Sequence, residues 1–140
     1  MKTAGFTLPH LQESHSLQRV LSSALQSTPS RSSVNFTPFW SARHFNLQQS
    51  GLFQNATTEQ QQCILALTTQ GLLEEAYFIE KAGVGYMAKM VMLSASTEER
   101  MLYALFSADE TYHLAQIMRF LPQKPVETDD AFLRFLADIV

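Results

Sequence analysis

The feature that most constrains the fold is the stretch over residues 58–93, whose apolar residues recur at helical spacing around almost the whole circumference. A helix that is apolar on nearly all sides has to be buried, so we expect this segment to be the central helix of a bundle. Its start is marked by a pattern that resembles a capping box, formed either by Thr57 with Gln60 or by Thr58 with Gln61.

A second long helix is predicted directly after the first. Ser96 is a good N-cap and Glu99 follows three residues later, and the helical pattern continues to about Leu121, before Pro122. Two long apolar helices joined by a tight link form an antiparallel hairpin, and we place its turn near Ala95.

The rest of the chain is also predicted to be helix or loop. No strand alternation, repeat or low-complexity segment is present, so the fold class is all-α. We expect a helical and loop extension over residues 1–57, and over residues 58–140 the helical hairpin with the start of a third helix. The smaller elements are helices over about 10–26 and 37–51, a loop over 27–35, and a helix that Thr128 caps in the segment 127–140.

Composition excludes several classes of protein. Apolar residues make up 46% of the 140 residues and charged residues 16%, and the net charge of −3 gives no reason to expect binding to nucleic acid or to an anionic membrane. The single Cys63 excludes an intrachain disulfide framework and fits a reducing, cytoplasmic location. No signal peptide and no run of apolar residues long enough to span a membrane are found.

Acidic residues inside the apolar hairpin point to a metal site. Glu110 and His113 are three residues apart and project from one face of the second helix. Counting residues outward from the turn near Ala95 places the segment with Glu74, Glu75 and Glu80 on the first helix at about the same distance from the turn as Glu110 and His113 on the second. These four glutamates have no Lys or Arg three or four residues away, and a buried carboxylate without a counter-charge is costly. Carboxylate and imidazole ligands favour iron or manganese.

Glu75 followed by the motif Glu110-Thr-Tyr-His113 resembles the first half of the ferritin-like di-iron carboxylate bundle, over residues 58–121. The Glu75-Ala-Tyr segment is similar to its oxygen-activating members. The resemblance implies that Glu75 and His113 are terminal iron ligands, that Glu110 bridges, and that a complete site holds two ions. Helical neighbours alone do not separate Glu75 from Glu80, and only the family spacing favours Glu75.

The chain departs from the family pattern after His113, because no further Glu and no second Glu-x-x-His follow. Three explanations stay open. The chain is the front portion of a longer protein, or two copies form a homodimer whose combined Glu75, Glu110 and His113 complete one centre, or the site is degenerate and binds nothing. The alternative to a metal site is a simple polar pair of Glu110 and His113 inside a helical bundle.

The function that the resemblance implies is a di-iron oxidase or oxygenase that uses O₂ to oxidise a small organic, apolar substrate. Ferritin-type iron oxidation and storage uses the same ligands and is the alternative. A third hypothesis is a non-catalytic helical bundle with a vestigial site. Whether the chain is an enzyme stays open at this point.

Overall fold

The computed structural model describes residues 12–27, 40–121 and 123–139, and these residues contain helices and no strand. The all-α prediction is therefore confirmed for the described part of the chain. In chain order the elements are α1 (Ser16–Ser27), the 3₁₀ helix η1 (Leu47–Gln49), α2 (Gly51–Gln54), α3 (Thr58–Leu93), α4 (Thr97–Ile117) and α5 (Ala131–Ile139).

The start of α3 is a complete capping box. The hydroxyl of Thr57 accepts a hydrogen bond from the backbone N–H of Gln60 at 3.3 Å, and the Gln60 side chain accepts one from the backbone N–H of Thr57 at 2.9 Å. Of the two pairs that the sequence offered, Thr57 with Gln60 is the one that forms. The side-chain amide of Gln61 then donates to the backbone oxygen of Phe53 at 2.9 Å, which ties α2 to the first turn of α3.

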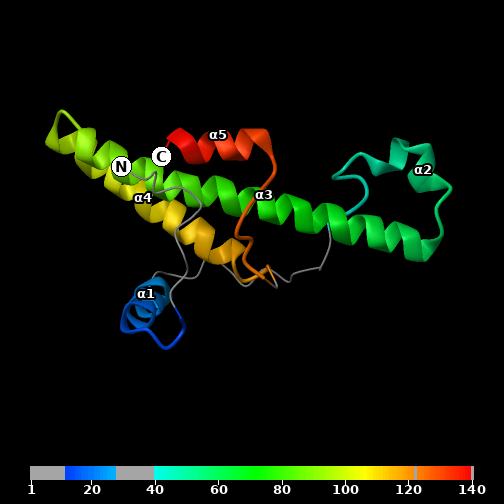
Figure 1. The fold of residues 1–140 in the computed structure, drawn as a ribbon, viewed down its shortest axis with the longest axis horizontal. Coiled ribbons are helices and arrows are strands. Elements are labelled where there is room, and N and C mark those ends of the chain that lie inside the picture. Colours follow the sequence, from blue (N-terminus) through cyan, green and yellow to red (C-terminus); the bar gives the residue numbers. More distant parts are fainter. Residues whose placement is uncertain (1–11, 28–39, 122, 140) are drawn as a thin grey trace.

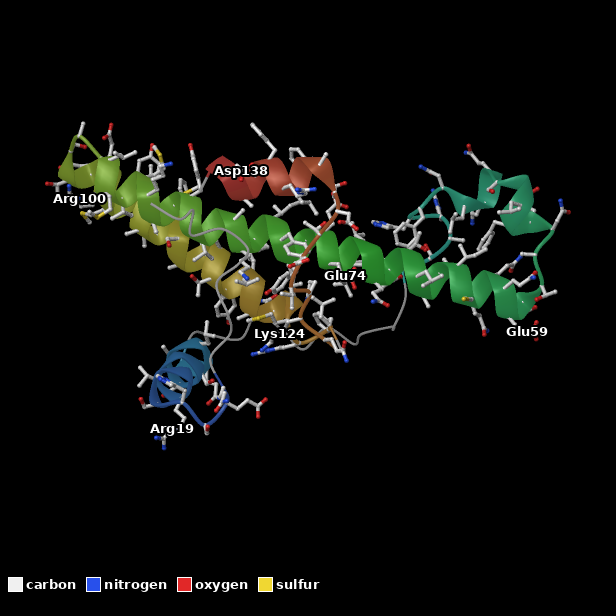
Figure 2. All side chains as sticks on the ribbon, in the orientation of Figure 1. Arg19, Glu59, Glu74, Arg100, Lys124 and Asp138 are labelled. Carbon is white, nitrogen blue, oxygen red and sulfur yellow. The ribbon has the colours of Figure 1, made fainter. Side chains whose placement is uncertain are left out.

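The turn between α3 and α4 lies where the sequence predicts it. The hydroxyl of Ser96 accepts from the backbone N–H of Glu99 at 3.1 Å, and the Glu99 carboxylate accepts from the backbone N–H of Ala95 at 2.8 Å. The two helices pack against each other as an antiparallel hairpin (Figure 1). Arg100 lies beside this turn, while Glu59 lies at the far end of α3, which extends well past α4 (Figure 2).

Two shorter helices differ from the sequence-based expectation. In its described part, the helix expected over 37–51 is replaced by turns and the short 3₁₀ helix η1. Asn46 adopts a left-handed φ of 54°, and Ser50 then caps a new helix at Gly51. The last helix is capped by Asp130 instead of Thr128. The Asp130 carboxylate accepts from the backbone N–H of Leu133 at 2.9 Å, while Thr128 accepts from the N–H of Asp130 at 3.2 Å.

The helix expected over 10–26 is present as α1, although the first residues of the expected range lie outside the described residues. Most of the loop expected over 27–35 also lies outside them. The second long helix ends at Ile117, and a turn leads from it to the buried Leu121.

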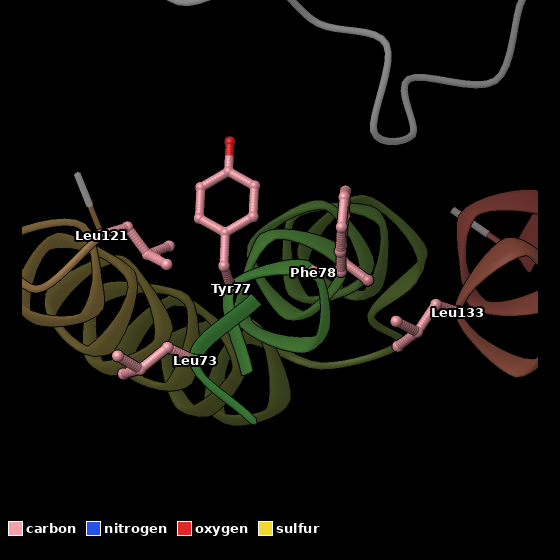
Figure 3. Packing of buried hydrophobic residues seen from close by; sticks show 6 residues of the cluster. Leu73, Tyr77, Phe78, Leu121 and Leu133 are labelled. Atoms are coloured by element: carbon pink, nitrogen blue, oxygen red, sulfur yellow. The ribbon is translucent and has the colours of Figure 1, made fainter. Parts of the chain in front are cut away.

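The hydrophobic core lies along the middle of α3. Leu121 follows α4 and lies on one side of α3, while Leu133 of α5 lies on the other, so α3 is the central layer of three (Figure 3). The buried cluster consists of Leu73, Tyr77, Phe78, Ala82, Leu121 and Leu133.

None of the helices in the described part of the chain is both long and apolar enough to cross a bilayer.

Candidate metal centre

Three side chains of the hairpin converge in the second half of α4. Glu80 comes from α3, and Glu110 and His113 come from α4. One ligand atom of each lies within 4.8 Å of the others. The Nδ1 atom of His113 is 3.5 Å from Oε2 of Glu80 and 3.7 Å from Oε2 of Glu110. The group therefore offers two carboxylates and one imidazole to a single point.

The register of the hairpin explains why these residues meet. Glu80 lies 15 residues before Ala95 and Glu110 lies 15 residues after it, so both lie at the same depth from the turn. His113 lies three residues after Glu110, which places its side chain on the same face of α4. The buried Tyr77 and Leu73 precede Glu80 by one and two turns, and this row of α3 faces α4.

A glycine makes room for the second carboxylate. A Cβ atom built on Gly83 would lie 3.2 Å from Cδ and 3.3 Å from Oε2 of Glu110. The Glu110 side chain thus lies directly over the backbone of α3, one turn beyond Glu80. From the sequence, Gly83 stands out only by its low helix propensity within the long helix. A glycine three residues after Glu80, inside an otherwise apolar helix, was the signal that could have marked it as part of the site.

The carboxylates are shielded more than the imidazole. The side chains of Glu80, Glu110 and His113 are 21%, 29% and 54% exposed, so the group lies just beneath the surface and opens through His113. The Oε2 atom of Glu80 has lost almost all contact with solvent and has no hydrogen-bond partner, since the 3.5 Å contact with His113 is too long for a good hydrogen bond.

Burial raises the pKa of Glu80 to about 7, and the hydrogen bond and negative charge of the neighbouring Glu110 add to this effect, while His113 acts in the opposite direction. The Glu80 carboxyl therefore keeps a proton well above the pH at which an exposed glutamate loses it. A cation that binds between the two carboxylates would take the place of that proton.

The structure places Glu80 beside Glu110 and His113, in the place where the family spacing favoured Glu75. Glu75 is exposed, because five residues along a helix correspond to about 140° around its axis, and Glu75 therefore points away from α4. Together with Glu74 it lines a different cavity, of about 350 Å³, between α3 and the segment before α5, which also includes Glu127, Asp129 and Asp130. The Glu74 carboxylate accepts a hydrogen bond from Gln70 at 2.8 Å.

A larger cavity lies far from the three-residue group. It has a volume of about 660 Å³, is mainly apolar, and lies between α2 and the first turns of α3, where Cys63 and Ile64 contribute to its wall. Cys63 and Glu80 are 17 residues apart on one helix, which corresponds to about 25 Å. This cavity is therefore too distant to hold a substrate that reacts at the group.

Comparisons with protein-family models, with curated proteins and with solved structures found no match to this chain. The resemblance to the ferritin-like family therefore stays a prediction from a few residues.

Proposed function

We propose that this chain binds a divalent transition-metal ion, iron or manganese, through Glu80, Glu110 and His113. The observation that carries the proposal is the meeting of two carboxylates and one imidazole within 4.8 Å on facing helices. Oxygen and imidazole ligands suit Fe²⁺ and Mn²⁺, while neither ion needs a thiolate.

The charge of the group supports a cation as its natural partner. Burial raises the pKa of Glu80, and the nearby negative charge of Glu110 adds to this effect because two ionised carboxylates close together repel each other. A divalent ion would neutralise both carboxylates and give the shielded Oε2 of Glu80 the partner that it lacks.

The reaction that we propose is oxygen activation for the oxidation of a small organic substrate. Three protein ligands leave further positions of an iron ion open, and a redox-active ion with open positions is what O₂ chemistry requires. The chain itself would hold the ion through Glu80, Glu110 and His113, and the half-exposed His113 marks the side from which O₂ and substrate would approach. A di-iron centre, as the resemblance implies, would need a second set of ligands.

Ferritin-type iron oxidation is the second candidate, and one observation favours it. The cavity beside α5 is lined by five carboxylates, which would attract Fe²⁺ to the protein surface. These carboxylates are Glu74, Glu75, Glu127, Asp129 and Asp130.

Metal analysis of protein produced with added iron or manganese tests the binding proposal. We expect about one ion per chain in the wild type, and loss of that ion in Glu80→Gln and in Glu110→Gln. Glu75→Gln is the matched control, because it makes the same change on the same helix but outside the group, and it should keep the ion. Metal loss in Glu75→Gln with retention in Glu80→Gln would overturn the assignment, as would metal-free wild-type protein.

Oxygen uptake separates the two reactions. Rapid oxidation of many added Fe²⁺ ions per chain would favour iron storage. Uptake that depends on an organic reductant and an apolar substrate, and that stops in Glu110→Gln, would favour the oxygenase.

A further inference from the structure

The side of α4 that points away from α3 is apolar over the first half of the helix. Met101 and Leu105, one turn apart, keep 62% and 65% of their surface exposed, and the neighbouring Leu102 and Phe106 keep 48% and 43%. Leu114 lies nine residues after Leu105, half a turn away around the helix, and packs against the core cluster. We call Met101, Leu102, Leu105 and Phe106 the outer face of α4.

No helix in the described part of the chain packs on this outer face. The described helices that pack on the hairpin meet at α3, which has α4 on one side and α5 on another, and α1 forms no comparable set of contacts with α4 (Figure 1). None of the 21 residues of α4 is buried. A helix that is apolar on two sides but covered on one presents a surface on which another helix can pack.

The two ends of the outer side of α4 carry opposite charges. Glu98 lies in the first turn, seven residues before Leu105, and Arg119 follows the last turn, 14 residues after Leu105, so all three point to the same side. Both charged residues are exposed, and among the described residues neither has an oppositely charged side chain within ion-pair distance. About 31 Å of helix separates them, so they cannot pair with each other within one chain.

We propose that a second copy of this chain packs on the outer face, with the two α4 helices antiparallel about a two-fold axis beside Ala108. Ala108 lies midway between Glu98 and Arg119, so this axis brings Glu98 of each copy close to Arg119 of the other. A parallel pair would instead bring like charges together at both ends. The inference is independent of the proposed metal binding, because the metal group of each copy stays between its own α3 and α4.

The side chains of the outer face also fit an antiparallel pair. The small Ala108 at the axis lets the two helices approach closely, and Leu105 of one copy then lies beside Tyr112 of the other. A second copy supplies the apolar surface and both charges from residues that are already on the page of the sequence, without a further binding surface. One helix face buries less than the about 800 Å² per partner of a typical stable interface, so we expect a reversible dimer.

Sedimentation equilibrium in the presence of a chelator tests the inference without metal. We expect the wild type to change from monomer to dimer between about 1 μM and 1 mM. Leu105→Glu should abolish the dimer and keep the helical circular dichroism spectrum, because Leu105 is exposed within the hairpin. Leu67→Glu is the matched control and should still dimerise, since Leu67 is 64% exposed but lies on the part of α3 that extends past α4.

Reversal of the two charges tests the antiparallel arrangement. Glu98→Arg and Arg119→Glu should each raise the dissociation constant of the dimer by about 10-fold at low salt, because each change places like charges together at both ends of the interface. The combined variant should recover the wild-type constant. A combined variant that dimerises no better than the single ones would overturn the antiparallel arrangement, and a wild type that stays monomeric would overturn the inference altogether.

Asp109 tests the position of the axis. It is adjacent to Ala108, so the two copies of its carboxylate lie near each other beside the axis and weaken the dimer by repulsion. Asp109→Asn should therefore lower the dissociation constant, and an unchanged constant would contradict an axis at this place. Because all these measurements are made without metal, a failure of the proposed metal binding would leave the expected dimer unchanged, and a missing dimer would leave the metal proposal intact.

Discussion

The carboxyl group of Glu110 on α4 fills the space that a side chain on Gly83 of α3 would take. The distance from an ideal Cβ on Gly83 to Cδ of Glu110 would be 3.2 Å. This close approach brings a carboxylate of α4 against the backbone of α3 beside Glu80. It makes Gly83 a positioning residue of the proposed metal centre.

Gly83→Ala should therefore weaken metal binding. The added methyl group would push Glu110 away from Glu80, and we expect Mn²⁺ affinity, measured by isothermal titration calorimetry, to fall by about 10-fold or more. Gly71→Ala is the matched control, since its Cβ would meet nothing within 4 Å. That variant should keep its Mn²⁺ affinity and gain about 0.5–1 kcal/mol in free energy of unfolding from better helix propensity. Equal Mn²⁺ affinities in the two variants would contradict the positioning role.

The stability of the metal-free protein should decrease between about pH 4.5 and pH 7. The pKa of Glu80 is raised to about 7 from 4.5, so folding favours the protonated carboxyl. The resulting stabilisation is complete below the unfolded pKa and is lost as the pH rises through the folded pKa. Urea unfolding at a series of pH values should show this decrease in the wild type and in Glu75→Gln. If Glu80→Gln shows the same decrease, another group is responsible.

Metal affinity should change with pH in the opposite direction. Because the ion and the proton compete for the Glu80 carboxylate, Mn²⁺ affinity should rise steeply up to about pH 7 and more slowly above it. Titration calorimetry in buffers of different ionisation enthalpy would measure the number of protons released. Binding without proton release at pH 6 would show that Glu80 is not a ligand.

Removal of the cap on α3 should destabilise the hairpin. Thr57→Ala removes a side chain that accepts from the N–H of Gln60, and caps of this kind contribute about 1 kcal/mol. Thr58→Ala makes the same change one residue later and should cost much less, because Thr58 is the first helical residue and not the cap. Chemical denaturation measures the free energy of unfolding of both variants and so compares the pair Thr57 with Gln60 to the pair Thr58 with Gln61. An equal loss of stability in the two variants would argue against the capping box at Thr57.

Leu133→Ala should detach α5 from α3. Leu133 is buried in the core cluster, and truncation of a buried leucine costs about 2–5 kcal/mol. Phe135→Ala on the same helix removes a larger but exposed side chain and should cost under about 1 kcal/mol. Hydrogen exchange should be faster throughout α5 in the first variant only.

The capping motifs and the spacing of apolar residues were enough to predict the all-α class and the hairpin. Ser96 with Glu99 placed the turn correctly, and residues equidistant from it lie at equal depth, so the level of Glu80 and Glu110 followed from counting. The pairing of Glu110 with His113 also followed from helix geometry, because residues three apart share a face on any α-helix.

Only the tertiary structure decided which glutamate of α3 faces that pair. Because α3 is apolar around nearly its whole circumference, its pattern has a helical period but no preferred side, and Glu75 and Glu80 looked equally buried. Packing of α4 on one side of α3 and α5 on another broke this symmetry, bringing Glu80 to Glu110 and His113 and leaving Glu75 exposed. The local sequence determines a helix and its period, but the direction in which each side chain points depends on the neighbours that the whole chain provides.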